Sequence, residues 1–333
     1  MTSISSDAAG EEDFRRLVEP HRLELHAHCY RMLGSVHDAE DALQEALLRA
    51  WRALPRFEGR SSLRSWLYRI ATNTSLDLIA RRRKRVLPVD FGPASDPHDE
   101  SGEPLVESVW VEPYPDEALA VEDGLAAPHA RYERRESVEL AFIAAVQHLP
   151  ASQRAVLILR DVLGFSAREV AETLGTTVNS VNSALRRARR AADERLPEQS
   201  QQVTLRALGD ERVRELVEAY MDALDRGDIE AITSMLAEDA TWSMPPYATW
   251  YRGEDAVSGF LLAGPLRERW RHLPSRANGQ PAVGCYLWNA EKERYVAAVL
   301  DVLSLRGGRI AEVTGFVTPE VFPRFGLPEE LPA

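Results

Sequence analysis

The feature that most constrains this chain is an acidic, proline-rich spacer, residues 86–130, between two segments with helical periodicity. The spacer holds 11 Asp or Glu, seven Pro and no Lys or Arg. Proline and like charges oppose packing and regular structure, so this composition predicts a linker. Arginine-rich clusters flank the linker at residues 81–85 and 186–190. A polyanion would therefore meet two cationic patches held apart by a segment that repels it.

Length and composition narrow the class of protein. A chain of 333 residues is expected to form two or three domains. No apolar run approaches the ~20 residues of a spanning helix, and the N-terminus has neither the basic start nor the apolar stretch of a signal peptide. Cys29 and Cys285 lie far apart, which argues against a disulfide framework. We therefore expect a cytoplasmic protein without a membrane segment.

The second basic cluster lies in a predicted helix-turn-helix. Ser166 and Glu169 have the spacing of a capping box at the start of a short helix, and Gly175 suits its left-handed end. Thr177 can cap a second helix, whose inward positions are predicted to be Val178, Val181, Leu185 and Ala188.

The outward face of that second helix is polar and basic. Asparagine and arginine suit base edges in the major groove, and serine and further arginines suit phosphates. The alternative is a solvated basic end on an ordinary helical bundle. The predicted DNA-contacting residues are Thr177, Asn179, Ser180, Asn182, Ser183, Arg186, Arg187 and Arg190.

The segment before the first basic cluster has a second polar stripe. Trp66, Arg69 and Asn73 recur at helical spacing, and an aromatic, an amide and a cation on one face suit unstacked single-stranded bases. Taken alone, Trp66 is more often a core residue. The preceding loop, residues 56–62, adds the candidate contacts Arg56, Phe57, Gly59 and Ser61.

These motifs resemble a known family. Residues 38–51, Phe57 with Gly59, and residues 66–73 are similar to region 2 of the extracytoplasmic-function (ECF) sigma factors of the sigma-70 family. Leu149, Pro150 and Arg154, followed by the helix-turn-helix, are similar to region 4. Relatives often carry Lys and Arg where this chain has Asn182 and Ala184, so its −35 preference is expected to differ.

The resemblance implies a division of labour. Region 2 would capture flipped bases of the −10 element with the loop and stripe residues, and region 4 would read the −35 element and contact the β flap of RNA polymerase. The linker would occupy the polymerase's basic nucleic-acid channel. Region 2 would also bind the clamp coiled coil of the β′ subunit, through Asp38, Asp41, Gln44, Glu45, Leu48 and Trp51.

Residues 210–330 change character, with helices followed by alternating strands that include a hairpin turn at Gly307 and Gly308. This part resembles the SnoaL-like domain, a cone-shaped α+β fold. Such a cone often encloses an apolar pocket for a small-molecule ligand, although the same aromatics could simply fill the core. The candidate lining residues are Trp242, Met244, Trp250, Tyr251, Phe260, Trp288 and Tyr295.

The residue types and their spacing give little support for catalysis or for metal binding. His272 is the only histidine of this domain and Asp301 its only inward carboxylate candidate, whereas Asp239 suits a turn. On one helix His21 and His28, with Cys29, lie too far apart to share a zinc ion. We expect no catalytic residue, cofactor or metal.

The predicted fold is therefore multidomain, with an all-α N-terminal half and a C-terminal α+β domain. The predicted boundaries are region 2 at 11–86, the linker at 87–130, region 4 at 131–196 and the SnoaL-like domain at 205–330. The predicted function is promoter-specific transcription initiation, with the C-terminal domain regulating it in cis. Two alternatives are a stand-alone helix-turn-helix regulator, which leaves residues 37–85 unexplained, and a small-molecule enzyme tethered to DNA.

Overall fold

The computed structural model describes residues 12–59, 61–97, 102–105, 109–117 and 136–333. These residues divide into two compact units. The helical unit comprises residues 12–59, 61–84 and 145–196, and the sheet unit comprises the described residues of 85–144 together with 197–333. None of the described helices combines the length and apolar character that crossing a bilayer requires.

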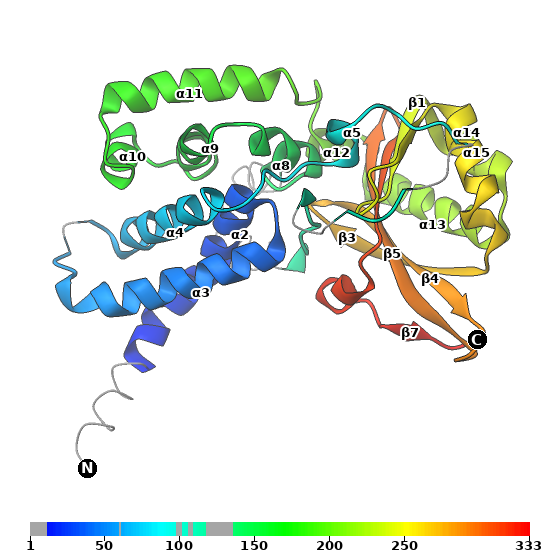
Figure 1. Ribbon diagram of the computed structural model, residues 1–333, viewed down its shortest axis with the longest axis horizontal. Helices are drawn as coiled ribbons and strands as arrows, with labels where there is room; N and C mark the ends of the chain where they lie inside the picture. Colours follow the sequence, from blue (N-terminus) through cyan, green and yellow to red (C-terminus); the bar gives the residue numbers. More distant parts are fainter. Residues whose placement is uncertain (1–11, 60, 98–101, 106–108, 118–135) are drawn as a thin grey trace, which may run out of the picture. The chain divides into compact units, whose positions relative to one another are not determined.

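The helical unit begins with three packed helices, drawn in blue in Figure 1. A serine caps each of the two longer ones: Ser35 accepts from the amide of Asp38, and Ser62 from the amide of Ser65. The elements are η1 (Glu19–His21), α2 (Arg22–Leu33), α3 (Val36–Ala53), η2 (Leu54–Arg56) and α4 (Leu63–Ile79).

The second part of the helical unit contains the predicted helix-turn-helix. Its elements are α9 (Ala151–Leu157), η4 (Ile158–Val162), α10 (Ala167–Thr173) and α11 (Val178–Asp193). Helix α8 (Leu140–Gln147) supplies residues to both units. The capping box of Ser166 and Glu169 and the cap at Thr177 are present, which confirms these local predictions.

The sheet unit is built on one seven-stranded sheet of order β2-β1-β6-β5-β4-β3, with β7 paired to β5. Only β1 and β6 run parallel, and the other pairs are antiparallel. The strands are β1 (Leu236–Ser243), β2 (Trp250–Arg252), β3 (Trp270–Ala277), β4 (Gln280–Asn289), β5 (Arg294–Arg306), β6 (Arg309–Phe316) and β7 (Glu330–Leu331).

Helices α13 (Asp210–Arg226) and α15 (Glu254–Ala263) pack against this sheet (Figure 1), with a core that includes Tyr220, Trp242 and Phe260. The mixed sheet with its helices confirms the predicted α+β domain, including the hairpin at Gly307 and Gly308 between β5 and β6. The remaining elements are α5 (Pro88–Phe91), α12 (Gln201–Leu208), α14 (Ile229–Met235), η5 (Pro265–Arg267) and η6 (Pro319–Phe325).

Candidate nucleic-acid interface and C-terminal pocket

Helix α11 presents one continuous polar face. Its inner side buries Val181, Leu185, Ala188 and Ala192. Val178, which was predicted to point inward, is 41% exposed because it occupies the first turn, where the helix leaves the core. Seven of the eight predicted DNA contacts on this helix and its cap are exposed, and Ser183 is half-buried. The helix therefore has an open face of the kind a groove-reading helix needs.

The arginines of the second basic cluster differ in their surroundings. Arg189 donates to both carboxylate oxygens of Asp161, at 2.8 and 2.7 Å, and is held against η4. Arg186 donates to Ser183 at 3.4 Å along the helix. Arg187 and Arg190 extend from exposed positions on the polar face. The cluster thus combines one arginine that positions the helix with cations directed to solvent.

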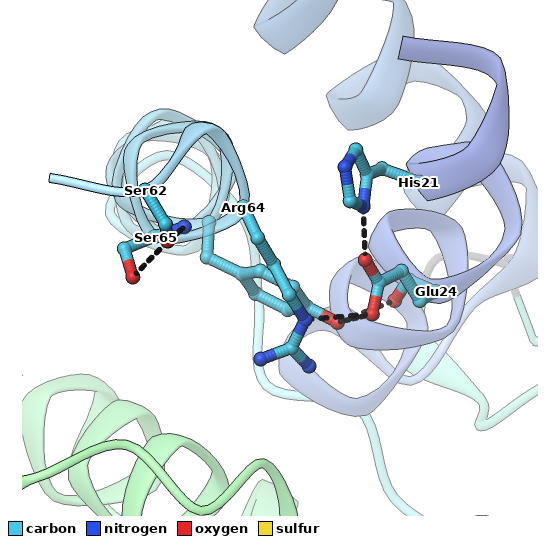
Figure 2. Close-up of polar contacts among 6 residues, drawn as sticks. His21, Glu24, Ser62, Arg64 and Ser65 are labelled. Carbon is cyan, nitrogen blue, oxygen red and sulfur yellow. Dashed lines mark hydrogen bonds and ion pairs between the residues drawn. The ribbon is translucent and has the colours of Figure 1, made fainter. Parts of the chain in front are cut away.

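The start of α4 is anchored to α2 by a half-buried polar network (Figure 2). The carboxylate of Glu24 accepts from Arg64 Nε at 3.0 Å and from the hydroxyl of Tyr68 at 3.2 Å. Its other oxygen lies 2.5 Å from His21 Nδ1. Because Ser62 caps the helix through the amide of Ser65, this network fixes the point at which the loop of residues 56–62 joins α4.

The predicted single-strand contacts lie next to this anchor. Arg69 and Asn73 are exposed on α4, and the loop residues Arg56, Gly59 and Ser61 are exposed as well. Trp66 is only 6% exposed, because Phe57 packs on it with ring centroids 4.8 Å apart. The structure thus brings the stripe and loop together, with the tilted aromatic pair of Phe57 and Trp66 next to the exposed cations.

Helix α3 carries the predicted polymerase surface. Asp41 and Gln44 are exposed, and Leu48 is 50% exposed although it is apolar. Glu45 accepts from Arg49 at 2.8 Å, and Trp51 packs edge-on against Phe14. Asp38 is the exception among the six predicted residues, because it is buried and forms an ion pair with Arg82 of the first basic cluster.

The helix-turn-helix packs against the three N-terminal helices within the helical unit. Tyr68 on α4 meets Phe165 edge-on at 5.3 Å, and Ser65 donates to Glu169 at 3.3 Å. The buried guanidinium of Arg154 donates to the carbonyl of Met32 at 2.5 Å and to that of Gln147 at 2.9 Å. Residues more than 100 positions apart are therefore joined by polar contacts.

A cavity of about 70 Å³ opens into the sheet unit beneath α13 and α15. Of the seven aromatic and Met candidates, Trp242 and Met244 line it. Tyr251 and Phe260 stack on each other in the core at 4.5 Å. Trp250, Trp288 and Tyr295 also lie away from it. The other lining residues are Leu224, Leu261, Pro265, Leu266, Trp270, His272, Cys285, Val299 and Asp301.

Two polar side chains that line this apolar cavity are paired with residues of α13. Asp301 accepts from the hydroxyl of Tyr220 at 2.9 Å, and burial raises the pKa of its carboxyl group. His272 Nδ1 lies 2.7 Å from Asp225 Oδ1. Sequence reasoning named Asp301 and His272 but missed their partners, because Tyr220 and Asp225 lie on α13 and only the fold brings them to the sheet. The pairs give the cavity hydrogen-bonding capacity on otherwise apolar walls.

The histidines and cysteine near the N-terminus are occupied in other ways. His28 Nε2 lies 2.9 Å from Thr72 Oγ1, and burial lowers the pKa of this histidine to about 3. Burial raises the pKa of the Cys29 thiol to about 12. Within the described residues no group of three or more His, Cys, Asp or Glu side chains is placed to hold a metal ion.

Three family profiles match consecutive parts of the chain. Sigma-70 region 2 matches residues 17–85, Sigma-70 region 4 matches residues 139–191, and the SnoaL-like domain matches residues 217–313. These ranges contain the α3 and α4 surfaces, the helix-turn-helix and the cavity, respectively.

Whole-chain relatives agree with the profiles. The chain is 42% identical to the ECF RNA polymerase sigma factor SigG of Mycobacterium tuberculosis, over 99% of this chain and 90% of the relative. It is 29% identical to SigW of Bacillus subtilis, over 56% of this chain and 91% of that protein. Its fold is similar to the crystal structure of M. tuberculosis SigJ, with a TM-score of 0.56, 22% identity, and coverage of 92% of this chain and 97% of that one. The chain belongs to the ECF sigma factors of the sigma-70 family, which direct RNA polymerase to promoters.

Proposed function

We propose that the residues of this sigma factor divide promoter recognition between α11 and α4. The exposed polar face of α11 would enter the major groove of the −35 element. The loop of residues 56–62 and the exposed Arg69 and Asn73 would hold the non-template strand of the −10 element. The observation that carries the proposal is the exposure of seven of the eight polar candidates on the α11 face and its cap, opposite a buried apolar side.

The partner surfaces are proposed from exposure as well. The β′ clamp coiled coil would bind α3 where Asp41 and Gln44 surround the exposed Leu48, since an apolar side chain ringed by polar groups is typical of a protein contact. Region 4 would contact the β flap. The acidic spacer would occupy the polymerase's nucleic-acid channel, because carboxylates suit a channel lined for phosphates.

For the C-terminal domain we propose regulation in cis through a small, mostly apolar ligand with one polar group. The cavity is apolar except for Asp301, His272 and Cys285. Burial raises the pKa of the Asp301 carboxyl group, which gives the cavity one polar group for a hydrogen bond with a ligand. A ligand there could bias the regulatory state only by binding one state of the chain more tightly than another.

In vitro transcription with core polymerase tests this function. Full-length protein and a protein truncated after residue 204 are compared across a promoter library. Promoter-specific transcripts with full-length protein, changed in level by truncation, are the expected result. Duplex binding without polymerase association would instead favour a stand-alone helix-turn-helix regulator. Equal transcription and equal core affinity for both proteins would contradict regulation in cis.

A further inference from the structure

The described part of the acidic spacer packs within the sheet unit. These residues, 86–97, 102–105 and 109–117, are together with Arg85 named the strap here, and they belong to the same compact unit as the C-terminal domain. In Figure 1 the strap is the cyan chain through α5 and the teal chain that follows it. The sequence predicted a linker without packing, so the contacts that hold the strap could not be inferred from its composition.

The two ends of the strap pair with each other. Arg85 is buried, and its guanidinium donates to the carbonyl of Trp110 at 2.7 Å and contacts Glu112 at 3.3 Å. Val86 forms a parallel bridge with Trp110, supported by main-chain hydrogen bonds of 2.9 and 3.0 Å. The two ends of the strap are therefore held together by main-chain bonds and a partly buried ion pair.

The middle of the strap is bound along β2 and α15. The indole of Trp250 donates to the carbonyl of Gly92 at 2.9 Å, and the carbonyl of Trp250 accepts from the amide of Ser95 at 2.8 Å. Pro97 lies so close to α15 that a Cβ on Gly259 would come within 2.9 Å of its Cβ. Glycine inside a helix is costly, so its presence at 259 fits a close approach by the strap.

The end of the strap is held by the turn between β3 and β4. Asn278 donates its amide to the carbonyl of Tyr114 and accepts from the amide of Tyr114 with its side chain, both at 2.8 Å. Asp116 accepts from the amide of Gly279 at 2.7 Å and from Arg276 at 3.2 Å. Tyr114 and Asn278 are both fully buried, so these bonds are shielded from water.

The strap is amphipathic although its sequence has no simple period. Six of its apolar side chains are buried, whereas Phe91 and several of its carboxylates are exposed. The buried set is Leu87, Pro88, Trp110, Val111, Pro113 and Tyr114, and the exposed set is Asp90, Asp96, Glu103 and Glu117.

We propose that the C-terminal domain is a clasp for the spacer, and that the strap must leave it before the spacer can occupy the nucleic-acid channel of RNA polymerase. This inference rests on the proposed function, in which the spacer lies in that channel. A main-chain group paired with Asn278 or Trp250 cannot line a channel at the same time. Docking and polymerase engagement are therefore mutually exclusive for the bonded strap residues Gly92, Ser95, Tyr114 and Asp116, and the clasp opposes transcription by holding the spacer.

Hydrogen exchange on the unmodified protein tests the clasp directly. The amides of Asn278 and Gly279 belong to the C-terminal domain, yet their acceptors are strap residues. We expect both amides to exchange at least about tenfold faster in the holoenzyme than in the free protein, as expected when their partners depart. Unchanged protection of both amides in a verified holoenzyme would overturn the proposal. Amides within β4 and β5 are the internal control.

A pair of glycine variants extends the test to activity. Gly259→Ala places a methyl group against Pro97 while improving the helix, so it should loosen the strap without unfolding α15. Gly264→Ala adds the same methyl at the end of that helix, where the nearest atom is 4.0 Å away. We expect Gly259→Ala alone to raise strap exchange and to increase core affinity about tenfold. Faster strap exchange with unchanged core affinity would contradict the clasp.

Two further substitutions keep the test decisive if the strap accommodates the methyl group of Gly259→Ala without loosening. Trp250→Phe removes the donor to Gly92, and Arg276→Ala removes the cation beside Asp116. A triple variant that includes Gly259→Ala and still shows unchanged strap exchange would refute the docking itself. Failure of the unmodified protein to bind core polymerase would instead refute the proposed function, so the two outcomes are distinguishable.

Discussion

The helical unit and the sheet unit each bury charged groups, but the pKa values of these groups differ, and the difference sets how each unit responds to pH. The buried groups include the guanidinium of Arg154 in the helical unit and the carboxyl groups of Glu139 and Asp301 in the sheet unit. Burial disfavours the charged form of all three groups, so it lowers the pKa of Arg154 and raises the pKa values of Glu139 and Asp301. Arg154 nevertheless keeps a pKa of about 10 and stays charged at neutral pH, while Glu139 reaches about 7.

The partners explain why each charge can be buried. Arg154 directs its fork of donors at the carbonyls of Met32, Gln147 and Leu149. Glu139 accepts from the first amides of α12, at Gln201 and Gln202. An arginine fork satisfies several carbonyls at once, and a carboxylate satisfies the unpaired amides of a helix start. The comparison teaches that the sheet unit, in its described residues, contains a buried carboxyl group, that of Glu139, whose pKa of about 7 lies near neutrality.

The largest effect is expected for Arg154→Ala. The substitution leaves buried carbonyl oxygens without donors, so the free energy of unfolding of the helical unit should fall by about 3 kcal/mol or more. Urea unfolding gives the measurement. The matched control is Arg168→Ala, because Arg168 is exposed and paired only with Glu172 along α10, and its loss should cost less than about 0.5 kcal/mol. Equal effects of the two changes would break the comparison.

A pH series on the sheet unit should give the next largest effect. The folded pKa of Glu139 lies above its ordinary value of 4.5, so the folded state binds the extra proton between about pH 4.5 and pH 7. The contribution of Glu139 to stability is therefore present at low pH and falls by about 2–3 kcal/mol as pH rises through 7. Hydrogen exchange of β4 and β5 amides at pH 5 and pH 8, corrected for intrinsic rates, reports it.

Glu139→Gln supplies the control for that series. Glutamine does not titrate, so the fall in stability between pH 5 and pH 8 should shrink by the same amount. An unchanged pH dependence in this variant would show that another group is responsible.

Tyr220→Phe should have a smaller effect on the sheet unit. It removes the hydroxyl that donates to Asp301, which should cost about 1–2 kcal/mol and raise the pKa of this carboxyl further. Tyr286→Phe is the matched comparison, since its hydroxyl donates at the same 2.9 Å to a carbonyl, that of Pro328. A larger loss for Tyr286→Phe would argue that Asp301 gains little from its partner.

The smallest effect on stability is expected for Arg187→Ala, because this side chain is exposed on α11. Its unfolding free energy should stay within about 0.5 kcal/mol of the unmodified protein. Binding of −35 DNA should weaken similarly for all sequences, and the salt dependence of log K should drop by about one. Salt titrations on several duplexes measure this. Weaker binding confined to one base pair would instead make Arg187 a base reader.

Local features were predictable from the sequence where neighbouring residues determine them. Ser166 and Glu169 form the expected capping box, and the polar face of α11 follows from its 3.6-residue period. The sequence left undecided whether Trp66 lies in the core or on the surface, because Phe57, which packs over it, comes from a loop. The domain boundaries and the individual DNA and polymerase contacts stay predictions.

Contacts across long sequence separations were beyond that reasoning. Tyr114 and Asn278 are 164 residues apart, and nothing near Tyr114 indicates its partner. The spacer's composition predicted solvation, yet a few apolar residues among its prolines suffice to bury one side. Likewise, the pairing of Asp301 with Tyr220 depends on which face of α13 meets the sheet.

Docking of the strap also shortens the distance that this part of the chain can span. Gly92–Glu117 is a stretch of 26 residues, and a chain of that length spans at most about 85–90 Å when extended. While it is folded onto the C-terminal domain, most of that reach is unavailable. Release would lengthen the connection available between regions 2 and 4. The same event would therefore free the carboxylates and let the two promoter-binding modules separate to match the spacing of their DNA elements.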